Sequence, residues 1–149
     1  MGLIIHIILE VAALFALFWT IRTRKLIPAI ISVFMIISIV LVIYPEIQNK
    51  FYGIYVYMAT AGLATVYGIS KLRSNRTGAY VIIGMSSTIF IYWLWVVNHW
   101  HGNTLVAPFV TLGLGLFALF TRVKLKNELG FLIILAADAI AILLENLLK

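Results

Sequence analysis

Asp138 is an acidic residue in the middle of an otherwise apolar segment, residues 131–147. A second carboxylate, Glu10, interrupts an equally apolar segment near the amino terminus, and His6 lies four residues before it. Glu145 follows Asp138 by seven residues. Because residues four or seven apart share one face of an α-helix, each carboxylate is predicted to share a helix face with its polar neighbour.

These carboxylates have no fixed cation to pair with, because no Lys or Arg lies well inside either apolar segment. Placing an ionised carboxylate in a bilayer costs about 2.5 to 3.5 kcal/mol even on the most lenient scale. Such a group must stay protonated, share a proton, bind a cation or contact water. We predict that Asp138 is largely protonated at neutral pH and exchanges its proton, with Glu10 as its preferred partner.

Two more histidines, His99 and His101, are separated by one residue in an uncharged connection. Imidazoles at this spacing bind zinc, copper or nickel if further ligands arrive from elsewhere, and Glu46 and His6 are predicted on the same side of the membrane. A regular helix would place residues two apart on opposite sides. They are therefore weak metal candidates, and we expect a polar cap with no bound metal and no other cofactor.

Composition identifies the environment of these residues. Of the 149 residues, 64% are hydrophobic and 11% are charged, and the mean hydropathy is +1.11. A chain this apolar cannot cover itself with a wettable surface, which excludes a soluble globular domain. The sequence has no cysteine, so disulfides and thiolate ligands are excluded as well.

Apolar segments of about 17 to 22 residues, long enough to cross a bilayer as α-helices, recur along the chain between polar flanks. They are residues 3–21, 28–44, 52–72, 79–97, 105–121 and 131–147. We therefore predict one all-α domain over residues 1–149, a polytopic membrane protein built as a bundle of six transmembrane helices.

Basic residues orient this bundle. The connections after the first, third and fifth segments hold nine of the eleven Lys and Arg residues, and the opposite side holds Lys50 and Lys149. Because Lys and Arg near span ends are retained in the cytoplasm, both termini are predicted outside, in the cell membrane. The same clustering excludes a nucleic-acid-binding stripe, so the predicted partner is the lipid bilayer.

Three functions remain open. The first is a transporter or ion or proton pathway, with Glu10 and Asp138 as a protonatable pair reached from the outer side, and a homodimer would help so small a bundle enclose it. The second is a structural or accessory subunit of a larger membrane complex. The third is an enzyme that acts on a lipid or quinone at the outer leaflet through His99, His101 and Glu46. The first two are favoured over the enzyme, because 149 residues leave no room for a substrate domain and no hydrolase or nucleotide-binding motif is present. Of these two we predict the transporter or proton pathway.

Overall fold

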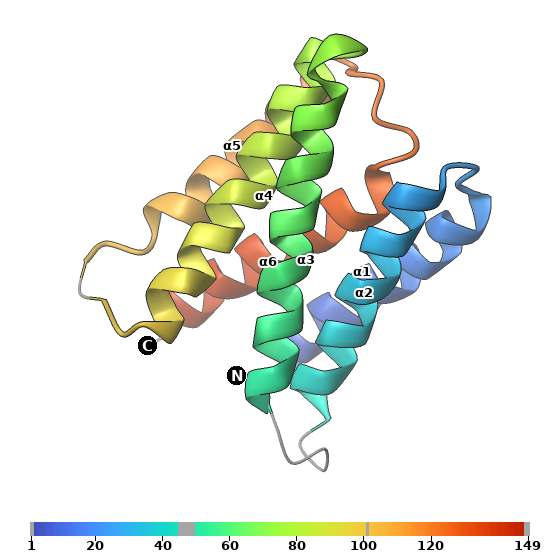
Figure 1. The fold of residues 1–149 in the computed structure, drawn as a ribbon. Helices are drawn as coiled ribbons and strands as arrows, with labels where there is room; N and C mark the ends of the chain where they lie inside the picture. The colour runs from blue at the N-terminus through green and yellow to red at the C-terminus, as the bar shows by residue number, and fades with distance from the viewer. Residues whose placement is uncertain (1, 45–49, 101, 148–149) are drawn as a thin grey trace.

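The computed structural model describes residues 2–44, 50–100 and 102–147. Over these residues the chain forms six α-helices, one short 3-10 turn and no strand, which confirms the all-α prediction. The helices are α1 (Gly2–Arg22), α2 (Leu26–Ile43), α3 (Lys50–Ser70), α4 (Arg76–Val97), α5 (Val106–Phe120) and α6 (Leu129–Leu147), and the turn η1 (Lys71–Arg73) joins α3 to α4 (Figure 1).

Four of these described helices, α1, α2, α4 and α6, are both long enough and apolar enough to cross a membrane. α5 has 15 residues. At about 1.5 Å per residue it covers roughly 22 Å, less than the ~30 Å hydrocarbon core. α3 has 21 residues, but its tyrosines reduce its hydropathy. The number of helices was thus predicted correctly, and four of them meet both conditions for a membrane span.

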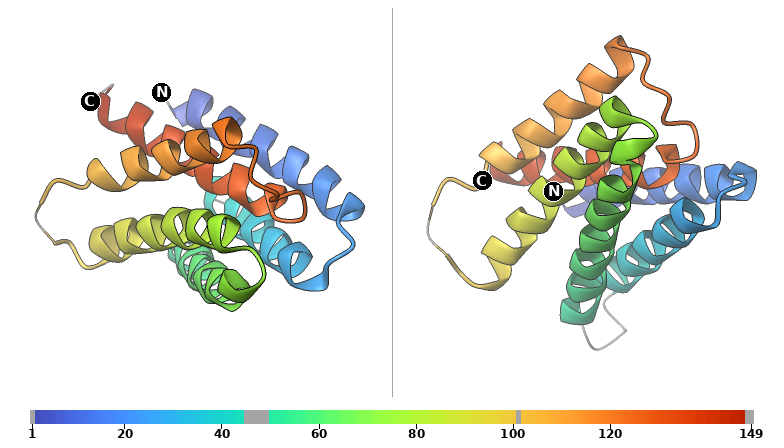
Figure 2. Two further views of the ribbon diagram at one scale, coloured as in Figure 1. Left: turned by 90° about the horizontal axis from the view of Figure 1, so that it is seen from above. Right: turned by 45° about the horizontal axis from the view of Figure 1, so that its top comes forward.

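The helices form a ring in chain order, in which each packs against its sequence neighbours and α1 closes the ring by packing against α6. α6 also contacts α2 and α4, which makes it the helix with the most neighbours. Ten of its 19 residues are buried. Figure 2 shows the amino-terminal end of α1 beside the carboxyl-terminal end of α6. The middle of α6 therefore lies in the core, where a polar side chain has no access to bulk solvent except through a cavity.

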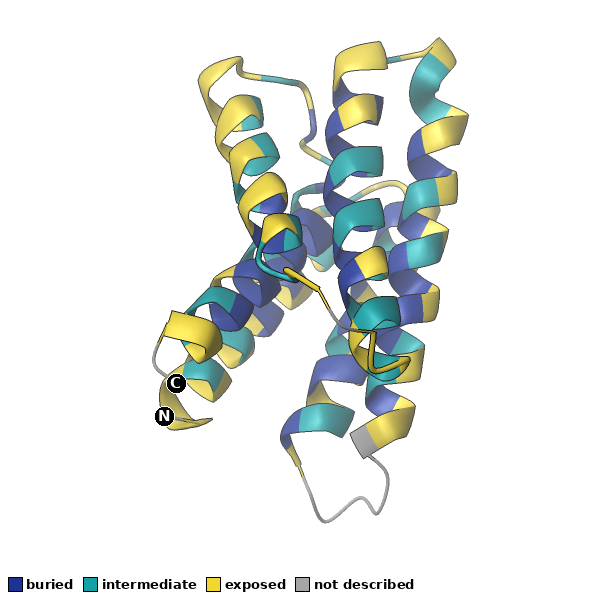
Figure 3. Ribbon diagram, turned by 90° about the vertical axis from the view of Figure 1, so that its left-hand side faces the viewer, coloured by how far each residue is buried: buried dark blue, intermediate teal, exposed yellow. Residues whose placement is uncertain are grey.

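Exposed residues run along the outside of the bundle (Figure 3), and many of them are large apolar side chains. On α1 the exposed side chains include Leu3, Val11, Leu14, Phe18 and Ile21, whereas small residues, Ala12, Ala13 and Ala16, face inward. Small inward residues let α1 approach α6 closely, as is common where helices pack within lipid. An apolar exterior of this extent is stable only against lipid or another protein.

Candidate functional site

Asp138 is buried at the middle of α6, with 6% of its surface exposed. Its Oδ2 atom accepts a hydrogen bond from the indole N–H of Trp93 in α4 at 2.9 Å. The Trp93 ring packs edge to face against Tyr57 of α3 and against Tyr92, with centroid distances of 6.4 and 5.4 Å. The carboxyl group therefore lies against an aromatic wall supplied by α3 and α4.

A cavity of about 170 Å³ lies beside this carboxyl group, between α1, α2, α3, α4 and α6. Most of its lining is aliphatic, and its polar lining residues are His6, Ser38, Tyr57, Trp93, Asp138 and Glu145. His6 and Glu145 are exposed, whereas Asp138 is buried, so the cavity runs from the surface to the middle of α6. We call it the Asp138 cavity. No Lys or Arg is among the described residues that line it.

Tyr57 contributes a second buried polar group to the Asp138 cavity. The residue is 6% exposed, and its hydroxyl has no hydrogen-bond partner of acceptable geometry among the described atoms. It is nevertheless close enough to Asp138 for the two side chains to interact. Ser38, by contrast, already donates its hydroxyl hydrogen to the carbonyl of Met35 at 2.6 Å. The Tyr57 hydroxyl and the Asp138 carboxyl group therefore lie close together at the wall of the cavity.

The structure brings together three of the four predicted pathway residues, because His6, Asp138 and Glu145 all line the Asp138 cavity. Glu10 is exposed on α1 and is absent from the lining of this cavity. It follows Leu9, which does line the cavity, and one residue turns the side chain by about 100° around the helix. Asp138 thus bonds to Trp93, and the expected pairing with Glu10 is not what the structure gives.

The weak metal candidates divide between described and undescribed residues. Glu46 and His101 lie outside the described residues. His99 is exposed, and its φ of 53° places it in the left-handed region just after α4. Its N–H donates to the Val96 carbonyl at 3.1 Å, and the next N–H reaches Trp95, the usual way in which a helix ends. His99 therefore terminates α4, and within the described part of the chain no group of three or more His, Asp or Glu side chains could hold a metal ion.

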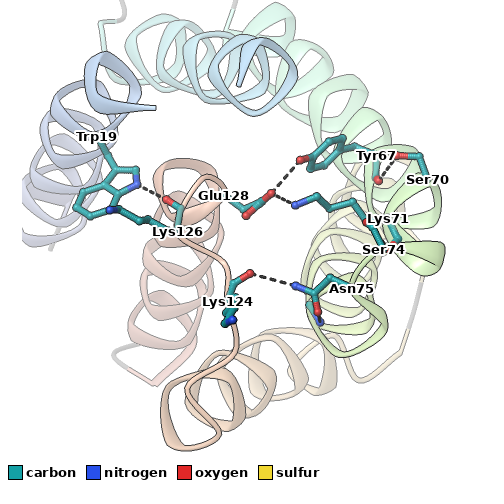
Figure 4. Close-up of polar contacts among 10 residues, drawn as sticks. Trp19, Tyr67, Ser70, Lys71, Ser74, Asn75, Lys124, Lys126 and Glu128 are labelled. Atoms are coloured by element: carbon teal, nitrogen blue, oxygen red, sulfur yellow. Dashed lines mark hydrogen bonds and ion pairs between the residues drawn. The ribbon is translucent and has the colours of Figure 1, made fainter. Parts of the chain in front are cut away.

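A second buried carboxylate, which the sequence did not single out, lies at the other end of the bundle. Glu128 directly precedes α6 and is 1% exposed. It accepts a hydrogen bond from the Tyr67 hydroxyl at 2.8 Å and forms an ion pair with the Lys71 ammonium group (Figure 4). We call Tyr67, Lys71 and Glu128 the Glu128 cluster. The one signal in the sequence was that Glu128 is the single acidic residue among the nine basic residues of these connections.

Two further hydrogen bonds fix the connection between α5 and α6 at this end. The Trp19 indole N–H donates to the Lys126 carbonyl at 2.6 Å, and the Asn75 side-chain amide donates to the Lys124 carbonyl at 3.1 Å (Figure 4). Asn75 also caps α4 by accepting the Gly78 N–H at 3.0 Å. Polar contacts thus join α1, α3 and α4 to one connection. We call this end, which holds the basic connections, the basic end.

No protein-family model matches the chain, and no curated protein or solved structure matches it. The two buried carboxylates differ in their surroundings. Glu128 has a cation beside it. Asp138 has an aromatic wall and a cavity that reaches the surface.

Proposed function

We propose that the chain is an integral membrane protein that forms a proton-coupled transport pathway, in which Asp138 takes up and releases the proton. The observation that supports this most directly is that His6, Asp138 and Glu145 line one cavity. Imidazole and carboxyl groups are side chains that relay protons. His6 and Glu145 lie at the surface end of the cavity, and Asp138 lies at the middle of the bundle.

The contrast between the two buried carboxylates supports Asp138 as the exchanging group. Glu128 has the Lys71 ammonium group beside it, so its charge is compensated in place. Asp138 has the neutral Trp93 N–H, which compensates an ionised carboxylate only in part. The ionised form therefore needs either a proton or another cation from the cavity. Asp138 would therefore bind a proton or another cation according to which of them the cavity holds.

In our proposal this arrangement is one state of a transport cycle. The Asp138 cavity is reached at the end where residues 2 and 147 lie, and the Glu128 cluster with its neighbouring hydrogen bonds holds the helices together at the basic end. Transport requires a second state in which the basic end opens. In our proposal the contacts of the Glu128 cluster break in that state.

We further propose that all six helices cross the cell membrane and that both termini lie outside. α2, α4 and α6 are apolar spans, and each of them begins at the basic end. The chain must return to that end between them, and α3 and α5 are the segments that do so. Tyr57 and Tyr67 of α3 are buried between helices, and the exposed Tyr52 and Tyr55 lie near the first turn of α3, where they would reach the lipid headgroups. Local thinning of the bilayer accommodates the short α5. The basic end then faces the cytoplasm.

Single-cysteine labelling tests this topology. Asn103 and Ser74 are exposed at opposite ends of the bundle, and the chain has no native cysteine. We expect Asn103→Cys to react with a membrane-impermeant maleimide added to intact cells, and Ser74→Cys to react only after the membrane is opened. The reverse pattern would invert the orientation, and equal labelling of both from outside would contradict six crossings.

Infrared spectroscopy tests the proton on Asp138. In the reconstituted parent protein at neutral pH we expect a protonated-carboxyl band that is missing in Asp138→Asn and that shifts on transfer to D₂O, because the cavity admits water. Glu10→Gln is the matched control and should keep the band, since Glu10 is exposed and lies outside the cavity lining. A parent spectrum without the band, or with a band that does not shift in D₂O, contradicts the proposed pathway.

A further inference from the structure

We propose that the Asp138 cavity binds a small organic cation of about eight non-hydrogen atoms, an ammonium group carried on a hydrocarbon body. This inference rests on the proposed function, because it names the molecule that would be transported in exchange for the proton on Asp138. Four properties of the cavity support it: the charge of its lining, its apolar walls, the buried Tyr57 hydroxyl and its volume.

The charge of the lining selects a cation. Asp138 is the buried acidic group and Glu145 a second carboxylate at the exposed mouth, and no Lys or Arg is among the described lining residues. An anionic molecule would meet the buried carboxyl group of Asp138, beside which none of the described lining residues places a Lys or Arg. A cationic molecule supplies the positive charge that the structure does not place beside Asp138.

The chemistry of the walls selects an organic cation over a metal ion. Divalent metal ions such as Ca²⁺ require about six to eight oxygen ligands. Eight of the fourteen lining residues are aliphatic, and the described part of the chain holds no cluster of three metal-ligating side chains. The aromatic rings of Tyr57 and Trp93 complete the wall. Aliphatic and aromatic surfaces favour a hydrocarbon body, and aromatic rings attract ammonium groups within about 6 Å.

The Tyr57 hydroxyl, which lies beside Asp138, supplies a further indication of a ligand. A buried hydroxyl without a hydrogen-bond partner costs about 1 to 3 kcal/mol, so native proteins seldom leave one unpaired. Only 6% of the surface of Tyr57 is exposed, and its side chain lines the cavity and interacts with Asp138. An ammonium group has three N–H donors. It could therefore donate to the Asp138 carboxylate and to the Tyr57 oxygen at once.

The volume limits the size of the bound cation. The cavity measures about 170 Å³, and an engineered cavity of about 150 Å³ in another protein binds benzene. A benzene ring with one aminomethyl group, benzylammonium, is therefore a suitable probe. When it binds beside a protonated Asp138, the carboxyl proton leaves to water and the carboxylate pairs with the ammonium group. One proton is released for each cation bound, and no bond to carbon changes.

The test is calorimetric titration of the purified full chain in detergent micelles with benzylammonium, with benzyl alcohol as the uncharged ligand of matched shape. We expect benzylammonium to bind and benzyl alcohol to bind more weakly by about tenfold or more, the value of a lost charge-assisted hydrogen bond. Repeating the titration in buffers of different ionisation enthalpy should show a proton released on binding. Equal affinities for the two ligands would overturn the inference.

Three variants assign the binding to the cavity. Asp138→Asn should weaken benzylammonium binding by about tenfold to a hundredfold, and Tyr57→Phe, which keeps the ring, by about threefold to tenfold. Glu10→Gln should bind as the parent does. Circular dichroism would show whether Asp138→Asn folds. If it does not fold, Tyr57→Phe and the comparison with benzyl alcohol still test whether the cation binds in the cavity. The inference is wrong if folded Asp138→Asn binds benzylammonium as the parent does. It is also wrong if Tyr57→Phe binds unchanged and the two ligands bind with equal affinity.

Flux measurements separate this inference from the proposed function. Proton flux that depends on Asp138, in a protein that binds no benzylammonium, overturns the cation site and leaves the proton pathway intact. Benzylammonium binding that depends on Asp138, in a protein without proton flux, upholds the cation site and overturns the transport pathway.

Discussion

Asp138→Asn is expected to reduce proton flux into reconstituted vesicles by about 100-fold, the lower range for the loss of a proton-transferring group. The asparagine amide cannot take up and release a proton near neutral pH. Its carbonyl oxygen can still accept the Trp93 N–H hydrogen bond, which spans 2.9 Å in the parent protein. The fold should therefore survive, and the loss should be one of function. A pH-sensitive dye inside the vesicles, with an imposed pH gradient, measures the flux.

Glu10→Gln is the matched control for this experiment, because it makes the same chemical change in another apolar span. Glu10 is exposed and does not line the Asp138 cavity, so the flux of this variant should stay within about twofold of the parent. An equal loss of proton flux in both variants would indicate that Glu10 also belongs to the pathway. If Asp138→Asn leaves the flux unchanged, Asp138 serves helix packing, and an accessory subunit becomes the better interpretation.

Lys71→Met is expected to destabilise the protein by about 3 kcal/mol, because it leaves the buried Glu128 carboxylate without its cation. Glu128 is 1% exposed, whereas the Lys71 side chain is 14% exposed. The estimate is at the lower end of the range of about 3 to 5 kcal/mol for broken buried pairs, since the Tyr67 hydroxyl still donates to Glu128. Thermal unfolding in detergent micelles, followed by circular dichroism, would show a lower midpoint temperature.

Arg73→Met is the control, since Arg73 is an exposed basic residue in the same turn as Lys71. It should change the stability by no more than about 0.5 kcal/mol. Removing the whole pair, in Lys71→Met with Glu128→Gln, should cost less than Lys71→Met alone, because no unpaired charge is then buried. Equal stability of Lys71→Met and Arg73→Met would show that the ion pair between Lys71 and Glu128 contributes nothing to the stability of the protein.

The sequence alone determined the all-α architecture and the number of helices. Lipid offers backbone groups no hydrogen-bond partner, so apolar segments of bilayer length must satisfy their own N–H and C=O groups as helices. The predicted segment 3–21 became α1, Gly2–Arg22, and residues 131–147 lie within α6, Leu129–Leu147. Asp138 was also identifiable, because a carboxylate in such a segment stands out by composition. Its place along the helix fixed its depth in the bundle.

The tertiary structure decided which side chains meet. α1 is apolar on nearly every side, so its sequence could not show that it turns His6 toward the cavity and leaves Glu10 outside. Trp93 bonds to Asp138 across 45 positions of sequence, and Lys71 pairs with Glu128 across 57. Hydropathy places a residue along the axis of a membrane helix, but the rotation of that helix and its neighbours are set only by packing.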